Sequence, residues 1–282
     1  MPWLLLALAI DAHAHLEPAD LAAGVRAAQA QKDAARIFLL TPPDTFDHPG
    51  RLDEEALLAA VGPPGKLAVI AGGSTLNAMI QEDSRDAAAF RARAEQLLKA
   101  GAIGFGEITV EHFAGGTPYQ SAPPDHPLML LLAGIAGGSG APIVLHMEAL
   151  RGNLAAFERL LDHDKRARIV WAHAGADGTG LRTPDLCRRL LKAHANLFME
   201  LKIDPRNPGL NPLLDGERLR PAWLELFQQF PDRFIIGSDQ HYAGDGRRWQ
   251  AMLGMLAQLP AELQRKIGGE NALRLYSRLE AK

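Results

Sequence analysis

Short apolar runs alternate with longer amphipathic stretches along the whole chain. The amphipathic stretches are rich in Ala, Leu, Arg and Glu and have helical periodicity, for example at 18–33, 84–100, 151–163 and 183–195. An alternation of this kind is typical of βα units around a parallel sheet. The apolar runs predict eight strands, near residues 8–15, 36–41, 67–71, 101–107, 142–147, 168–173, 196–203 and 233–239.

Eight strand–helix units in a chain of 282 residues fit an α/β fold of the (β/α)8 TIM barrel type better than an open doubly wound sheet. No predicted strand is followed by the Gly-x-Gly-x-x-Gly turn of dinucleotide-binding folds or by a phosphate-binding P-loop. No low-complexity linker or shift in composition divides the chain, so we expect residues 1–282 to form a single domain. The loops at 112–124 and 204–212 carry clusters of Gly and Pro, and in a barrel they would lie over the catalytic face.

The composition is that of an ordinary globular protein, with 47% hydrophobic and 22% charged residues, which excludes disordered and fibrous classes. A formal net charge of -3 gives no electrostatic footprint for nucleic acid. Beyond the amino end, no segment sustains about 18 apolar residues without a charge, so no membrane span is expected. We therefore expect a small-molecule substrate and no nucleic-acid or membrane partner. Association into a homo-oligomer is left open.

The first nine residues, MPWLLLALA, resemble the apolar core of a signal peptide that ends in an Ala-x-Ala site. No Lys or Arg precedes this run and the run is short, so we interpret it as the lead into the first strand. That interpretation predicts a cytoplasmic protein. Periplasmic export is the alternative if residues 1–9 are the remnant of a signal peptide.

The first predicted strand ends in two histidines one residue apart, in the sequence IDAHAHL at 10–16. Residues two apart face the same side of a β-strand, whereas on a helix they diverge by about 200°. From same-face positions about 6.6 Å apart along a strand, two imidazoles can bind one ion at about 2.0 to 2.1 Å per nitrogen. The alternative for His13 and His15 is an ordinary strand end that hydrogen-bonds to nearby backbone, and the pair alone does not decide between the two.

Five of the eight predicted strands end in a residue that an apolar core cannot use. Because barrel active sites form at the carboxyl ends of the strands, these side chains would meet at one mouth. Taken singly, each has a structural alternative: a hydrogen-bonded histidine, a helix cap or a salt bridge. Buried together without partners they would cost several kcal/mol per unpaired ion, and a bound metal ion removes that cost. The set comprises His13, His15, Glu107, His146, His173 and Asp239.

This set resembles the metal-binding motif of the amidohydrolase superfamily, and the resemblance extends from IDAHAHL to the closing KIGGENALRLY at 266–276. Glu107, in FGEI, looks like the bridging glutamate of the TatD branch and occupies the place where phosphotriesterases use a carboxylated lysine. The closing GGENALRLY is similar to the tail of the amidohydrolase-related branch, whose members often hold one metal and no bridging carboxylate. The number of ions, one or two, is therefore left open.

The resemblance implies a metal-dependent hydrolase in which a metal-bound hydroxide attacks a small ester, lactone, amide or phosphoester. Asp239 would be the catalytic residue, because it would orient the hydroxide, accept its proton and pass that proton to the leaving group. Imidazole and carboxylate ligands without thiolate suit zinc, with manganese, iron, cobalt and nickel as alternatives. The implied ligands are His13, His15 and Asp239 for the first ion, His146 and His173 for the second, and Glu107 as the bridge.

Two residues beside the metal set are candidates for substrate binding. Lys202 lies in MELKI near the end of the seventh predicted strand, where it could contact an anionic group. The alternative for Lys202 is a plain salt bridge to Glu200 or Asp204. His241 follows Asp239 closely enough to line the mouth.

Three other functions stay open on the sequence. A mononuclear decarboxylase would need no bridging acid, and Glu107 argues against it. A nuclease like TatD would need a basic surface that binds successive phosphates of a nucleic acid. The net negative charge of the chain indicates no such surface. A barrel that binds a metal and a ligand without turnover would have the same fold, and only an assay separates it from an enzyme.

Overall fold

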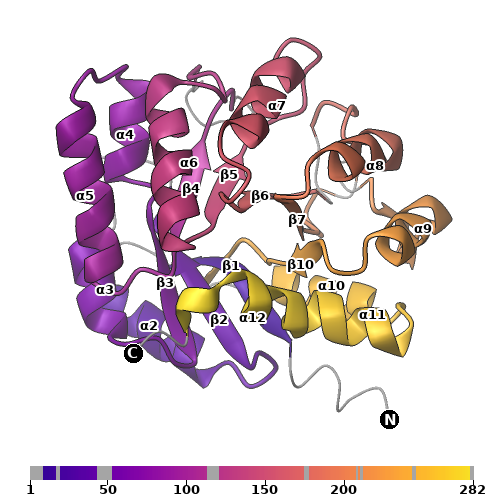
Figure 1. Ribbon diagram of the computed structural model, residues 1–282. Helices are drawn as coiled ribbons and strands as arrows, with labels where there is room; N and C mark the ends of the chain where they lie inside the picture. The colour runs from indigo at the N-terminus through magenta and orange to yellow at the C-terminus, as the bar shows by residue number, and fades with distance from the viewer. Residues whose placement is uncertain are drawn as a thin grey trace.

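The computed structural model of the protein describes residues 9–16, 20–42, 53–112, 121–174, 178–207, 209, 212–242 and 246–279. Within these residues a parallel sheet of nine strands curls around a centre, and helices cover its outer side (Figure 1). The architecture is a TIM barrel, which confirms the predicted fold.

All eight predicted strands are present, and the last of them is broken in two. In sheet order the strands are β1 (Ile10–Leu16), β2 (Arg36–Leu40), β3 (Leu67–Gly72), β4 (Gly104–Thr109), β5 (Ile143–His146), β6 (Ile169–Trp171), β7 (Leu197–Leu201), β10 (Phe234–Ile236) and β11 (Gln240–Tyr242). β10 pairs with β7 and β11 pairs with β1, so the segment 234–242 joins the two ends of the sheet. In the break, the Asp239 backbone N–H donates to the His13 carbonyl at 2.7 Å. We call this junction between β1 and the segment 234–242 the seam.

Several helices begin where the sequence offers a capping side chain or a proline. The Thr183 hydroxyl accepts a hydrogen bond from the Leu186 N–H at 3.2 Å, and Pro184 lies in the first turn. The Asp86 carboxylate caps the helix in the predicted stretch 84–100 in the same way, by accepting from the Ala89 N–H at 2.8 Å. The four predicted helical stretches are confirmed as α2, α5, α7 and α8, with shorter bounds. The helices are α2 (Leu21–Ala30), α3 (Glu54–Val61), α4 (Thr75–Gln81), α5 (Ala87–Lys99), α6 (Pro127–Ser139), α7 (Leu154–His163), α8 (Pro184–Ala193), α9 (Pro221–Gln229), α10 (Arg247–Leu256), α11 (Ala261–Arg265) and α12 (Asn271–Leu275).

Three shorter elements complete the described chain. A hairpin of β8 (Leu214–Asp215) and β9 (Arg218–Leu219) follows β7. A π-helical turn, Lys266–Glu270, joins α11 to α12, and a 3-10 turn, Ser277–Leu279, follows α12.

Apolar side chains form two layers, one outside the barrel wall and one inside it. Alternate residues of β2 divide between them: Ile37 and Leu39 pack beneath the helices, whereas Phe38 and Leu40 point into the interior. Tyr276, which follows α12, fills the interior beside Phe38, with the two rings 4.9 Å apart. The lower interior is therefore an apolar core, and a group of polar side chains lies above it at the carboxyl ends of the strands.

A register shift in β1 decides which way its histidines face. Ala12 packs in the interior layer, so simple alternation would turn His13 outward. The pairing of β1 with β2 shifts register between Asp11 and Ala14, and beyond the shift both His13 and His15 face inward. Such irregularities re-aim side chains next to active sites.

A second register shift does the same for β4. Phe105 and Ile108 both pack in the outer layer, although they are three residues apart. The pairing of β4 with β5 shifts register between them. Glu107 therefore faces the interior instead of sharing the outward face of Phe105.

Among the described residues, no helix has the length and the apolar character needed to cross a membrane. Residues 1–8, which hold most of the amino-terminal apolar run, lie outside the described residues. The same is true of 113–120 in the first predicted long loop and of residues 208, 210 and 211 in the second.

We expect Gly237→Ala to destabilise the fold, because Gly237 lies in the seam against other chain segments. An added methyl group would lie 2.5 Å from the His13 Cβ atom and 2.7 Å from the Glu200 carboxyl carbon. Overpacking of this kind costs about 1 to 3 kcal/mol. The free energy of unfolding in urea measures it.

Gly134→Ala, on the exposed side of α6, is the matched control for this substitution. Nothing lies within 4 Å of the methyl group that it adds. This control should gain about 0.4 to 1 kcal/mol through the lower entropy of the unfolded chain. Equal unfolding free energies for the two variants would contradict the close approach at Gly237.

Candidate metal centre

All six predicted strand-end side chains meet at one place, and the carboxylate of Glu107 lies at its middle. Glu107 Oε2 lies 3.6 Å from His13 Nε2 and 3.7 Å from His15 Nε2. Glu107 Oε1 lies 2.7 Å from His146 Nδ1 and 3.1 Å from His173 Nε2. Each oxygen of this one carboxylate therefore faces a separate pair of histidines.

Asp239 completes the group around the first pair. Its Oδ1 atom lies 3.1 Å from His15 Nε2 and 3.9 Å from His13 Nε2. Asp239 has a φ of 49° and His173 a φ of 62°, in the left-handed region that non-glycine residues rarely adopt. Backbone strain of this sort is retained where the surrounding structure enforces it, typically at functional sites.

The histidines of the first pair present their lone pairs to a common point. His15 Nδ1 lies 3.0 Å from the Leu40 carbonyl, which can only accept, so this nitrogen carries the proton. His13 Nδ1 likewise donates to Glu200 Oε2 at 2.8 Å. The two Nε2 atoms lie 3.2 Å apart. In the neutral rings both Nε2 atoms are acceptors, and a cation between them resolves the repulsion of their lone pairs.

The electrostatics of the centre also favour a cation. Burial lowers the pKa of His13, but the Glu200 and Glu107 carboxylates outweigh burial and raise it well above its ordinary value. Burial alone would raise the pKa of Glu107, yet the charge of His13 and the hydrogen bond from His146 hold it well below its usual range. Burial lowers the pKa of His146 to about 4, so this ring is neutral at pH 7. A divalent ion would supply the positive charge that a proton on His13 otherwise provides.

The donor set therefore fits metal ions. His13, His15 and Glu107 offer three ligand atoms within 4.8 Å of one another, and Glu107, His146 and His173 offer three more. Imidazole nitrogens and carboxylate oxygens are the donors that zinc and related first-row ions accept.

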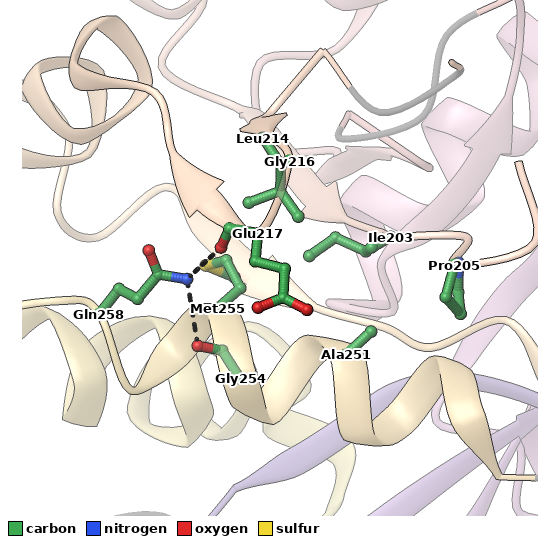
Figure 2. Close-up of a pocket in the computed structure, with 9 residues that line it drawn as sticks. All are labelled: Ile203, Pro205, Leu214, Gly216, Glu217, Ala251, Gly254, Met255 and Gln258. Carbon is green, nitrogen blue, oxygen red and sulfur yellow. Dashed lines mark hydrogen bonds between the residues drawn. The ribbon is translucent and has the colours of Figure 1, made fainter. Parts of the chain in front are cut away.

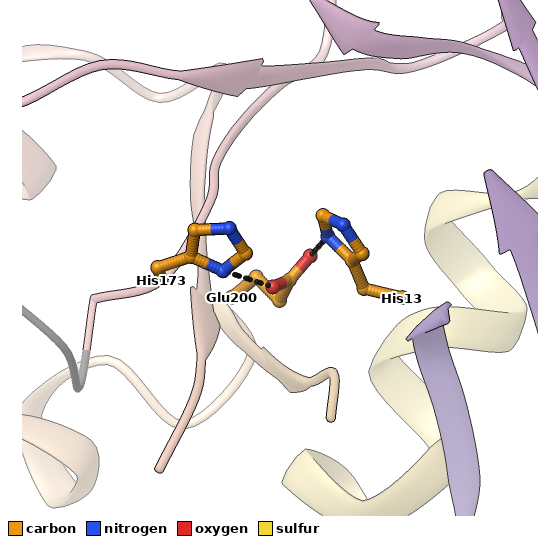
Figure 3. A group of neighbouring side chains, drawn as sticks. All are labelled: His13, His173 and Glu200. Carbon is orange, nitrogen blue, oxygen red and sulfur yellow. Dashed lines mark hydrogen bonds and ion pairs between the residues drawn. The ribbon is translucent and has the colours of Figure 1, made fainter. Parts of the chain in front are cut away.

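Glu200 is a residue whose role the sequence did not reveal. It lies on β7, has no exposed surface, and sits between the rings of His13 and His173 (Figure 3). Its Oε1 atom lies 3.3 Å from His173 Nδ1, and its other oxygen accepts from His13. Burial raises the pKa of Glu200, but His13 lowers it to about 2, so it stays ionised. One carboxylate thus orients one histidine from each pair.

A second pair missed by the sequence analysis lies beyond His146. His112 Nδ1 lies 2.8 Å from Glu148 Oε1, and that oxygen lies 3.9 Å from His146 Nε2. The rings of His112 and His146 are 4.1 Å apart. The spacing of His146 and Glu148 repeats the two-residue spacing of the first strand, and this signal could have drawn attention to Glu148.

Buried Arg182 holds the backbone that carries the second pair. Its guanidinium donates to the carbonyls of Ala172 and His173 at 2.7 and 2.6 Å. The same guanidinium donates to the Met147 carbonyl and lies over the Trp171 ring, 4.2 Å from its centroid. The ends of β5 and β6 are thereby fixed to each other.

The two predicted substrate-binding residues lie beside the centre. Lys202 Nζ contacts Asp239 Oδ2, not Glu200 or Asp204 as the salt-bridge alternative supposed. His241 is exposed on β11, with its ring 5.2 Å from that of His15. Binding of substrate by either residue stays a prediction.

A cavity of about 600 Å³ lies between the β8–β9 hairpin and α10 (Figure 2). None of the six residues of the centre lines it. Its walls include Ile203, Leu214, Ala251 and Met255, and Glu217 projects into it.

Comparisons with known proteins agree with this architecture. A model of the amidohydrolase family matches residues 10–278. An uncharacterised TIM-barrel protein from Bordetella bronchiseptica is similar at 15% identity, over 96% of this chain and 99% of that one, with a TM-score of 0.62. No match is found among curated proteins.

Two further solved structures share the fold and carry descriptions of what they do or bind. A phosphotriesterase homology protein from Escherichia coli, with phosphate in its active site, matches at 13% identity over 96% of this chain and 99% of that one, with a TM-score of 0.61. A β-aspartyl dipeptidase from Fervidobacterium islandicum matches at 15% identity over 96% of this chain and 73% of that one, with a TM-score of 0.59. At these identities the likeness concerns the fold.

We expect Glu107→Gln to reduce the metal content from about two ions per chain to one. The amide has one acceptor oxygen in place of two, so it cannot link two ions. Elemental analysis of protein purified without chelator and reloaded with zinc measures the change. Glu225→Gln, on the exposed side of α9, is the control and should keep the parent content. A parent protein that saturates at one ion would contradict the bridge.

Glu200→Gln should weaken metal binding without removing a ligand atom. The amide has one oxygen in place of two, so it cannot present an acceptor to both His13 and His173, and loss of such supporting contacts typically costs about 10- to 100-fold in metal affinity. Competition with a zinc chelator of known affinity gives the dissociation constants. Unchanged affinity would show that the orientation of His13 and His173 does not depend on Glu200.

Proposed function

Since the chain belongs to the amidohydrolase family, we propose that it is a metal-dependent hydrolase that cleaves a small ester, lactone, amide or phosphoester. The observation that carries this proposal is the division of the Glu107 carboxylate between two histidine pairs. The fold neighbours also support it, since one is a dipeptidase and another holds phosphate in its active site. Both carbonyl and phosphoryl substrates therefore stay within the proposal.

In this proposal the side chains of the centre bind two divalent ions, preferably zinc. When bound, these ions lower the pKa of a water molecule so that hydroxide is available near neutral pH, and they polarise the carbonyl or phosphoryl oxygen of the substrate. The ligands would be His13, His15 and Asp239 at one position, His146 and His173 at the other, and Glu107 between them.

Asp239 is the proposed proton acceptor. Burial would raise the pKa of its carboxyl, but the Lys202 ammonium and His15 hold it well below its usual range. It is therefore ionised at neutral pH, and Oδ1 faces the side of the centre where His15 lies. From there Asp239 would take the proton that attack releases and deliver it to the leaving group.

The supporting residues keep the histidines in the tautomers that this chemistry needs. The Leu40 carbonyl fixes the proton of His15 on Nδ1, and Glu200 does the same for His13. Arg182 fixes the backbone of His173. Because these partners are already in place, little reorganisation is needed when ions and substrate bind.

We expect Asp239→Asn to retain the fold and to lose about 10²- to 10⁴-fold in kcat, because the amide cannot accept the proton. The assay is a panel of small esters, lactones, amides and phosphoesters, run on protein of matched metal content. Activity within a few-fold of the parent would contradict the role of Asp239. The same panel with a carboxylated substrate and carbon dioxide detection distinguishes a decarboxylase, and no turnover by fully loaded protein would favour a non-catalytic barrel.

A further inference from the structure

Two cationic side chains contact one oxygen of the Asp239 carboxylate. Lys202 Nζ contacts Oδ2, and Arg248 Nη1 lies 3.2 Å from the same atom. The other oxygen, Oδ1, faces His15. One side of the carboxylate thus belongs to the metal centre and the other side to the two cations.

Arg248 binds acceptors of the protein through both terminal nitrogens, Nη1 and Nη2, and only its buried Nε has no hydrogen-bond partner among the described residues. Its Nη1 also donates to the Asp239 backbone carbonyl, and its Nη2 donates to Asp204 Oδ2 at 2.9 Å. Asp204 in turn accepts from Arg206, with 3.3 Å between Nε and Oδ1. Arg248 therefore acts as a fixed brace between the start of α10 and the loop after β7, and it already neutralises Asp239 on the Oδ2 side.

Lys202 makes fewer contacts with the protein than Arg248 does. Among the residues that the structure describes, its ammonium contacts no acceptor other than Asp239. An ammonium has three N–H donors, so two of them have no protein acceptor within the described part of the chain. The residue directly follows β7 at the catalytic end of the barrel, and 12% of its side chain is exposed.

The carboxylates near Lys202 already have other partners, so they do not fully neutralise the charge of its ammonium. Glu200 is engaged by His13 and His173, and Asp204 by Arg248. Asp239 already faces a guanidinium, and in the proposed centre it also binds an ion. A largely buried cation without a full counter-charge is costly, and an anionic ligand would remove the cost.

We propose that the substrate carries an anionic oxygen group, a carboxylate or a phosphate, which binds Lys202 beside the scissile bond. This inference rests on the proposed hydrolase function and narrows its substrate class. A lysine ammonium is a compact point charge that accepts either anion, so the chemistry of Lys202 does not choose between them.

A pair of esters that differ in one charge tests the proposal. The substrates are 4-nitrophenyl hydrogen succinate, which has a free carboxylate, and its neutral methyl ester. The metal-loaded parent should favour the charged ester by about 10- to 100-fold in kcat/KM, the range expected for a charge-assisted hydrogen bond. Lys202→Met should bring this ratio close to one.

The ratio separates recognition of charge from the effect of Lys202 on Asp239, because that effect acts on both esters alike. Lys202→Gln, which is polar and uncharged, is a second variant and should lose the preference as well. Lys192→Met, on the exposed side of α8, is the control and should keep it. A parent without preference, or a Lys202→Met variant that keeps it, would overturn the proposal.

Calorimetry with succinate and with inorganic phosphate gives a readout that does not depend on turnover. The loaded parent should bind at least one of these anions about 10-fold more tightly than loaded Lys202→Met, and the anion that shows the difference identifies the class. Equal binding by both proteins, or no binding by the parent, would overturn the proposal. If the parent hydrolyses neither ester nor any member of the substrate panel but shows the Lys202-dependent binding, the proposed hydrolase function fails and the anion site stands.

Discussion

The carboxylate of Glu107 is shared between two pairs of histidines, and the other parts of the centre are arranged around that sharing. Four imidazoles and two further acids converge on a largely buried space, in which His146 and Asp239 keep some exposure to solvent. Such a group is stable only if every lone pair and every charge has a partner. The protein meets part of this requirement with Glu200 and the Leu40 carbonyl, which fix ring protons, and in the proposed function the inward-facing atoms would bind cations.

The barrel places these atoms through two local departures from regular strand geometry. Without the register shifts in β1 and β4, the inward alternation of the lower barrel would turn His13 and Glu107 towards the helices. In β1 and β4, therefore, one set of alternate residues faces the apolar interior below the shift, and the other set faces the polar centre above it. Arg182 then ties β5 to β6 by binding their terminal carbonyls, so that His146 and His173 have a fixed separation.

Much of this arrangement could be predicted from the sequence because it depends on local pattern. Apolar runs located all eight strands, and polar residues at their ends located the six side chains of the centre. Register shifts, by contrast, depend on pairing with a neighbouring strand, so the sequence of β1 gave no sign that Ala12 and His13 share a side. His13, His112 and Asp204, which contact Glu200, Glu148 and Arg248 respectively, lie 187, 36 and 44 residues away from them along the chain, and only the closed barrel brings them together.

The break in the last strand lies where the sheet closes into a ring. Closure of the barrel therefore also brings the last side chain of the centre into place. Asp239 lies in the break, where its N–H binds the His13 carbonyl and its side chain faces His15. An ion held there would cross-link the first and last strands of the barrel, over more than two hundred residues of chain. Its binding energy would add to the stability of the closed ring, since a ligand that binds only the native state stabilises that state. Loss of the ion and opening of the seam would then be coupled steps.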